Sequence, residues 1–122
     1  MVKKIANNDM TEVLAEKVAL VDFSATWCGP CQMLAPVVDA LAEELEGQVA
    51  VYNVDVDANS DLAMQYRVMS VPSLLLFKDG QVAGQTVGYM GGGVMLQAGI
   101  HYGVGNGVAE LVRVTLSDRL RG

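Results

Sequence analysis

The stretch Trp27-Cys28-Gly29-Pro30-Cys31 contains the only two cysteines of this 122-residue chain; an apolar run precedes it and a helical pattern follows it. In the first turn of a helix, residues i and i+3 lie on one face, so the sulfurs of Cys28 and Cys31 can come within disulfide distance. Pro30 suits that turn because its missing N–H would have no hydrogen-bond partner there. Unpaired backbone N–H groups and the helix dipole also stabilise a thiolate on Cys28. A Cys-x-x-Cys pair that ends a strand and opens a helix therefore predicts a dithiol/disulfide redox centre.

Length and composition predict a single domain spanning residues 1–122. Hydrophobic residues make up 52% of the chain and charged residues 18%, a balance that favours a packed core. The formal net charge of −6 disfavours nucleic acid and anionic membranes as partners, since both are negatively charged. No apolar run approaches the ~20 residues of a membrane-spanning helix, and residues 1–9 lack the apolar core of a signal peptide. Two cysteines are too few for a secreted disulfide framework, so we expect a cytoplasmic protein.

Apolar, β-branched runs alternate with helical patterns along the chain. The runs that predict strands cover residues 2–5, 18–24, 49–56, 73–77 and 82–88. Helices are predicted after a cap at Asn8 or Asp9, after the cysteines, around residues 62–66 and over residues 108–120. Lys78-Asp79-Gly80, between the last two strands, is a hairpin signal. Alternating strands and helices followed by a hairpin indicate an α/β fold with a mixed sheet.

Two of the predicted helices have an apolar face. In the short first helix, the expected inward residues are Val13, Leu14 and Val18. The helix after the cysteines has a longer stripe, formed by Leu34, Val37, Val38, Leu41 and Leu45. Gly47 predicts where that helix stops. The strand over residues 18–24 is apolar almost throughout, which predicts helices on both faces of the sheet.

The segment from residue 91 to residue 107 interrupts this alternation. Eight of the 13 glycines fall between Gly88 and Gly107, and apolar residues alternate from Val94 to Val104 with the period of two that is typical of a strand. We expect an additional antiparallel strand here, turned back along the last strand of the sheet by the glycines at 91–93. Glycines weaken a strand, so this one is expected to be marginal and ordered mainly when paired, which provides a route to self-association.

The cysteine stretch and its surroundings resemble the thioredoxin family. The residues that carry the resemblance are Trp27-Cys28-Gly29-Pro30-Cys31, Val21-Asp22-Phe23, Ala35-Pro36 and Val71-Pro72-Ser73. The resemblance runs from about Lys3 to Tyr89 and resumes near Ala109, so roughly 16 residues before the last helix look inserted. It implies the thioredoxin fold, with a mixed central sheet of about five strands flanked by about four helices and an extra segment near residues 91–107.

For the redox site, the resemblance implies a division of labour. Cys28 is expected to be the nucleophile on the solvent side of the helix start, and Cys31 the buried thiol that resolves the mixed disulfide. Asp22, within the apolar strand, becomes the candidate proton acceptor for Cys31, and burial is expected to raise its pKa toward neutrality. Many relatives place a lysine near this acid. Here the matching position is Asn53, so the acid lacks the usual cation. The pKa of Asp22 is therefore expected to be higher than it would be beside a lysine.

The resemblance also implies a shallow apolar docking surface around the disulfide. Pro72 is expected to have a cis peptide bond and to face the disulfide, while Val71 presents backbone groups to an extended substrate segment. The residues expected to contact substrate are Trp27, Gly29, Pro30, Val56, Ser70, Val71, Pro72, Val87, Gly88 and Tyr89.

Together these expectations favour a general protein-disulfide reductase, recharged by a thioredoxin reductase that uses NADPH. The chain itself is expected to bind no cofactor and no metal. Two alternatives remain open. One is a scaffold whose inserted segment serves binding or assembly. The other is a dimer bridged by a metal or cluster through Cys28 and Cys31, because one chain has too few cysteines and histidines for a four-ligand zinc site.

Overall fold

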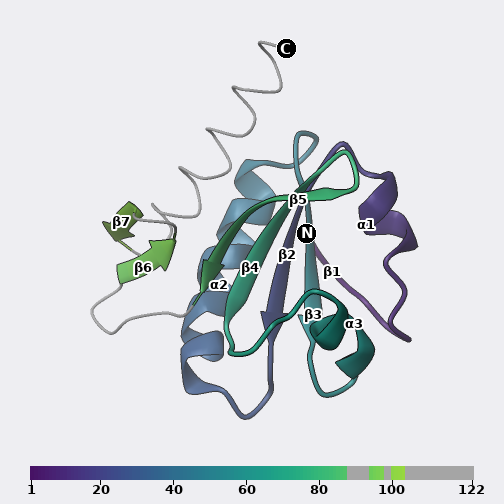
Figure 1. The fold of residues 1–122 in the computed structure, drawn as a ribbon. Coiled ribbons are helices and arrows are strands. Elements are labelled where there is room, and N and C mark those ends of the chain that lie inside the picture. Colours follow the sequence, from purple (N-terminus) through teal and green to yellow (C-terminus); the bar gives the residue numbers. More distant parts are fainter. Residues whose placement is uncertain (88–93, 98–99, 104–122) are drawn as a thin grey trace.

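The computed structural model describes residues 1–87, 94–97 and 100–103. Its main sheet has five strands in the spatial order β1-β3-β2-β4-β5 (Figure 1). Their bounds are β1 Val2–Lys4, β2 Val18–Ser24, β3 Ala50–Asp55, β4 Ser73–Lys78 and β5 Gln81–Val87. β3 runs parallel to both β1 and β2, whereas β4 is antiparallel to β2 and β5 is antiparallel to β4. The prediction of a mixed five-stranded sheet is confirmed.

Three helices lie in the described part of the chain, namely α1 Thr11–Ala15, α2 Gly29–Glu44 and α3 Ser60–Gln65. The apolar side of α2 packs on one face of the sheet, against alternate residues of β2 such as Val18 and Leu20. Residues of α1 and α3 cover the opposite face, toward which Ala19, Val21 and Phe23 of the same strand point. Successive side chains of a strand point to opposite faces, so β2 is buried from both sides, as its apolar run predicted. The helix predicted over residues 108–120 lies outside the described residues.

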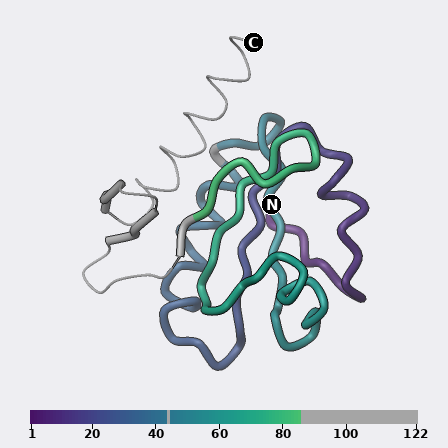
Figure 2. The backbone as a smooth tube through the Cα atoms, in the orientation of Figure 1, coloured from purple at the N-terminus to yellow at the C-terminus, as the bar shows by residue number. Residues whose placement is uncertain are grey.

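The helix α2 begins at the cysteine stretch, where Cys28 is the N-cap and Pro30 lies in the first turn. Its predicted stripe is confirmed by the buried or partly buried residues Leu34, Val37, Val38, Leu41 and Leu45. The helix ends at Glu44, and Gly47 follows with a left-handed φ of 85°. The backbone tube in Figure 2 shows that the loop from β2 into α2 and the loop that leads into β4 lie at the same end of the sheet. This end carries the cysteines.

The first helix differs from its prediction. Of the three residues expected to face inward, Val13 is buried, but Leu14 is 45% exposed and Val18 belongs to β2. A helix of five residues is too short to present two turns of an apolar stripe.

The predicted caps of this helix are also wrong, because the N-cap residue is Met10 and its side chain makes no capping hydrogen bond. Asp9 instead accepts hydrogen bonds from the N–H and the hydroxyl of Thr11. Asn8 fastens α3, since its Oδ1 accepts from the N–H of Leu62 at 3.1 Å and its own N–H donates to Oδ1 of Asn59.

The strands β4 and β5 form the predicted hairpin. Asp79 and Gly80 both have positive φ, 53° and 81°, as a tight two-residue turn requires. A Cβ atom built on Gly80 would lie 3.2 Å from the carbonyl oxygen of Leu14, so this position combines a left-handed backbone with a close neighbour. Gly47 is left-handed as well, but nothing lies within 4 Å of its Cβ position.

The prediction of a single extra strand between residues 91 and 107 is wrong for the residues that the structure describes. Two short strands, β6 Val94–Gln97 and β7 Ile100–Gly103, pair with each other in antiparallel register and form a separate two-stranded sheet (Figure 1). Pairing across a two-residue connection closes a much smaller loop than pairing with a distant edge, so it has the lower entropic cost. The alternating pattern thus identified strand residues but not their partner.

Replacing Gly80 by alanine should destabilise the fold more than the same change at Gly47. Either substitution places a Cβ on left-handed backbone, which lowers the free energy of unfolding by about 1 kcal/mol. Only the Cβ of Gly80→Ala would also lie within 3.2 Å of the Leu14 carbonyl oxygen. In urea unfolding we expect losses of about 2 kcal/mol for Gly80→Ala and about 1 kcal/mol for Gly47→Ala. Equal losses would show that the Leu14 contact relaxes without cost.

Candidate active site

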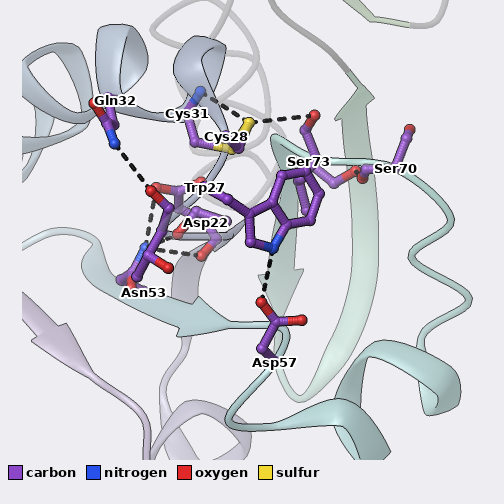
Figure 3. The surroundings of a disulfide bond; sticks show 12 residues. Asp22, Trp27, Cys28, Cys31, Gln32, Asn53, Asp57, Ser70 and Ser73 are labelled. Atoms are coloured by element: carbon purple, nitrogen blue, oxygen red, sulfur yellow. Dashed lines mark hydrogen bonds between the residues drawn. A yellow bond between two sulfur atoms is a disulfide. The ribbon is translucent and has the colours of Figure 1, made fainter.

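The two cysteines form a disulfide where the loop after β2 enters α2 (Figure 3). Their Cα atoms lie 5.2 Å apart, within the usual range for a disulfide. As the N-cap, Cys28 accepts a hydrogen bond on Sγ from the N–H of Cys31 at 3.2 Å. This N–H belongs to the first turn, where backbone donors have no partner within the helix. It therefore supplies a donor that stabilises a Cys28 thiolate once the disulfide is reduced.

Hydrogen bonds on both sides of the cysteines fasten this loop. The N–H of Cys28 donates to the carbonyl of Ala25 at 3.2 Å. One turn into α2, the side-chain amide of Gln32 donates back to the carbonyl of Thr26 at 3.0 Å. The loop is thereby tied to the helix that follows it, which holds Cys28 at the cap position. Gln32 was not singled out by the sequence, because a glutamine on a helix has many possible partners.

Cys31 is buried, as expected, but in the disulfide form Cys28 is buried equally, which differs from its expected position on the solvent side. Cys28 and Cys31 are each 5% exposed, because Ala25, Val56 and Val71 pack around both. What distinguishes the cysteines is their surroundings. Cys28 faces the loop before β4, whereas Cys31 lines a cavity beneath α2.

The loop before β4 brings the Val71 carbonyl oxygen to 3.8 Å from Sγ of Cys28. The peptide bond between Val71 and Pro72 is cis, as the resemblance implied. The hydroxyl of Ser73 donates to the carbonyl of Ser70 at 2.7 Å and so ties the two ends of this loop together. Residues that are 43 positions apart in the sequence thus meet at the disulfide.

Trp27 lies beside the disulfide with 71% of its surface exposed. Its indole N–H donates to Oδ2 of Asp57 at 2.8 Å, which fixes the ring against the loop that follows β3 (Figure 3). An exposed aromatic side chain that is held in one orientation is a ready contact for a partner protein. Asp57 was not predicted from the sequence, because no local pattern around an acid that follows a strand indicates a hydrogen-bond partner 30 residues away.

The other predicted docking residues are placed as follows. Gly29 and Pro30 are exposed, and Val56 packs against the two cysteines. Val87 is the last residue of β5 and pairs with Ser73, which puts its backbone next to the loop that carries the cis proline. Gly88 and Tyr89 lie outside the described residues.

Asp22 is the one charged residue inside the apolar run of β2, and it is 4% exposed. Burial raises the pKa of its carboxyl group from 3.8 to about 6, which is the direction expected from the sequence. A hydrogen bond from Asn53 opposes the rise in this pKa, and the charge of Asp39 adds to it. The side-chain amide of Asn53 donates to Oδ2 of Asp22 at 3.3 Å, while Oδ1 has no hydrogen-bond partner in the described part of the chain.

Asp22 and Cys31 line the same cavity, which has a volume of about 930 Å³ and lies between α2 and the strands β1, β2 and β3. Asn53 and Asp39 also contribute to its wall. Asp22 and Cys31 therefore open onto one space, with the carboxyl group of raised pKa on the sheet side and Cys31 at the start of α2.

Among the described residues, no three or more His, Cys, Asp or Glu side chains are grouped so that they could hold a metal ion. In this same part of the chain, no helix has both the length and the apolar character needed to cross a membrane.

A disulfide at a helix N-cap, beside an exposed tryptophan and opposite a cis proline, defines a thiol–disulfide oxidoreductase that acts by dithiol/disulfide exchange. Residues 1–98 match the family model described as Thioredoxin. The chain is also similar to the proteins named thioredoxin from Staphylococcus aureus strains Mu50 and MW2. Each is 46% identical over 86 residues, which cover 70% of this chain and 83% of the relative. The chain belongs to the thioredoxin family.

Asp22→Asn should stabilise the oxidised protein at neutral pH. Because the pKa of Asp22 is higher in the folded state than in the unfolded chain, folding favours the protonated form. The wild-type free energy of unfolding should therefore fall between about pH 4 and pH 6 and stay lower above that range, by about 3 kcal/mol. Urea unfolding from pH 4 to pH 8 measures this difference. A wild-type curve that rises through this range, with no gain from Asp22→Asn, would contradict the account of Asp22.

Proposed function

We propose that this protein is a general protein-disulfide reductase in which Cys28 attacks the substrate, Cys31 resolves the mixed disulfide and Asp22 accepts the proton of Cys31. The single observation that carries the proposal is the different setting of the two sulfurs. Sγ of Cys28 lies at the helix N-cap against the Val71 carbonyl, whereas Cys31 shares a cavity with Asp22.

The reaction has two exchange steps. The Cys28 thiolate attacks one sulfur of a substrate disulfide, forms a mixed disulfide with it and releases the other sulfur as a thiolate. Cys31 then loses its proton to Asp22 and attacks Sγ of Cys28. The bond between Cys28 and the substrate breaks, the internal disulfide forms, and the second substrate sulfur leaves as a thiolate. The substrate gains two electrons, and the two cysteines supply them.

The docking surface supports substrates that present an extended segment next to their disulfide. The carbonyl of Val71 lies close to Sγ of Cys28, so backbone hydrogen bonds to this loop would align the attacked sulfur. Trp27 offers an exposed aromatic contact, held by Asp57. Ser70 is exposed at the start of the same loop, and Val56 and Val71 supply apolar contacts beside the cysteines. Backbone recognition with few side-chain contacts suits a reductase that acts on many proteins.

The partners that this activity requires are protein disulfides and a reductase that returns electrons to the disulfide. We propose a thioredoxin reductase that uses NADPH, so that the chain itself needs no bound cofactor. A reducing compartment keeps such a cycle running, which favours the cytoplasm as its location. The acidic net charge of −6 disfavours nucleic acid and anionic membranes among the partners.

Serine substitutions test the division of labour. Cys28→Ser should abolish reduction of a protein disulfide such as insulin in an assay coupled to reductase and NADPH. Cys31→Ser should also stop turnover, but it should accumulate mixed disulfides with substrate because attack survives and resolution does not. Non-reducing gels and intact-mass measurements detect the trapped species.

Trapping by Cys28→Ser with none by Cys31→Ser would reverse the assignment. Metal analysis of the same wild-type sample addresses the bridged dimer. A metal that is held stoichiometrically and protects both cysteines from alkylation would contradict a free redox pair.

We propose in addition that the segment 91–107 promotes self-association without taking part in the redox site. In the described residues, β6 and β7 pair with each other and not with the main sheet. Each of these strands therefore has an edge to which a second chain could add a strand.

Deleting residues 92–107 should leave insulin reduction within about twofold of wild type, because Cys28 and Cys31 depend on β2 and α2. Sedimentation velocity should show a larger monomer fraction for the deletion variant. Loss of activity in a folded deletion variant would make the segment part of the working site, and an unchanged monomer fraction would refute its role in assembly.

A further inference from the structure

Met69 is the most exposed of the methionines whose burial the structure describes. Its side chain is 92% exposed, whereas Met10 is buried in the core. A single exposed apolar residue is common on protein surfaces. What sets Met69 apart is therefore its place in the fold.

Met69 lies in the loop that carries the cis proline, two residues before Val71. This loop and the start of α2 lie at the same end of the sheet (Figure 2). Two residues of chain span at most about 7 Å, so the backbone of Met69 is close to the carbonyl that faces Sγ of Cys28. The exposed thioether thus belongs to the rim of the surface on which substrate disulfides are proposed to dock.

The neighbours of Met69 are anchored on both sides. Val68 packs against the core, and its N–H donates to the carbonyl of Ala63 at 2.8 Å. On the other side, the carbonyl of Ser70 accepts a hydrogen bond from the hydroxyl of Ser73 at 2.7 Å. The backbone therefore holds Met69 outward at a fixed position, and its exposure does not come from a loosely tethered loop.

Peroxides convert a thioether into a group of different character. A lone pair of the sulfur attacks one oxygen of hydrogen peroxide, an S–O bond forms, the O–O bond breaks and, after a proton shift, water leaves. The sulfur loses two electrons and the peroxide gains them. The sulfoxide is polar and chiral, where the thioether was apolar and flexible. In the disulfide form both cysteines of the chain are bonded to each other, so no thiolate of this protein competes for the oxidant.

We propose that Met69 is an oxidation site through which hydrogen peroxide weakens the docking of substrate proteins. The inference rests on the proposed function, in which this surface receives the disulfides of many proteins. Methionine suits such a surface because its flexible, polarizable side chain adapts to different apolar partners. A sulfoxide must lose its hydration when the same partner covers it, so binding weakens while the exchange chemistry of Cys28 and Cys31 is untouched.

Peroxide treatment of the disulfide form tests the proposal. Peptide mass analysis should show that Met69 is modified much faster than the buried Met10. After removal of peroxide, the protein is reduced with dithiothreitol, which leaves sulfoxides in place, and single-turnover reduction of insulin is measured at increasing insulin concentration. The insulin concentration that gives half the maximal rate should rise about fivefold, with the maximal rate within about twofold of the untreated protein.

Two leucine variants separate Met69 from the other methionines. Met69→Leu has no oxidisable sulfur at this position, so its treated and untreated samples should share one half-maximal insulin concentration, whatever its value. Met64→Leu is the matched control, because Met64 is 76% exposed but lies on α3. Peroxide should weaken docking by Met64→Leu as much as by wild type. Methionine sulfoxide reductases specific for each of the two sulfoxide epimers, supplied with dithiothreitol, should together restore the treated wild type.

The outcomes separate this inference from the function on which it rests. An unchanged half-maximal insulin concentration after full oxidation of Met69, or a peroxide effect that persists in Met69→Leu, would overturn the role of Met69. A fall in the maximal rate alone would place the effect on the exchange chemistry and overturn the inference as well. Failure of untreated wild type to reduce insulin would instead refute the proposed function.

Discussion

The N–H of Cys31 donates to Sγ of Cys28 because Cys28 occupies the N-cap of α2, and the rest of the site depends on this arrangement. The first turn of a helix leaves backbone donors without partners, and here one of them is directed at sulfur. The buried strand β2 and the apolar stripe of α2 fix where that turn lies. Stability of the core and reactivity of the thiol are therefore coupled through a single helix end. A change in the packing of α2 would move the donor and the sulfur together.

Burial of Asp22 is the second constraint, and it opposes stability. A carboxyl group inside an apolar strand is costly to ionise, which is why burial raises the pKa of Asp22 to about 6. In the function proposed above, an acid that titrates near neutral pH accepts the proton of Cys31. Asn53 moderates the effect with a neutral hydrogen bond. Desolvation, this donor and the charge of Asp39 together set the pKa of Asp22.

The sequence predicted well where local and tertiary preferences agree. The apolar run at residues 18–24, the stripe of α2, and Asp79-Gly80 between β4 and β5 were all recognisable, because periodicity and turn chemistry are local properties. The sequence-based predictions failed where contacts between separate elements determine burial or the hydrogen-bond partner. The equal burial of the two cysteines depends on contacts with distant residues that no local pattern encodes. The bond from Trp27 to Asp57 was missed for the same reason. The cap of α1 and the pairing of β6 with β7 are local, but the residue types did not distinguish them from the alternatives.

The most direct test of the account is the rate at which each cysteine is alkylated in the fully reduced protein at pH 7. Because the cap donor favours the thiolate of Cys28 alone, iodoacetamide should modify Cys28 at least tenfold faster than Cys31, as judged by peptide mass analysis over time. It should also react faster with Cys28 than with free cysteine. Equal rates for the two residues, or preferential modification of Cys31, would contradict the assignment of the helix cap as the source of reactivity.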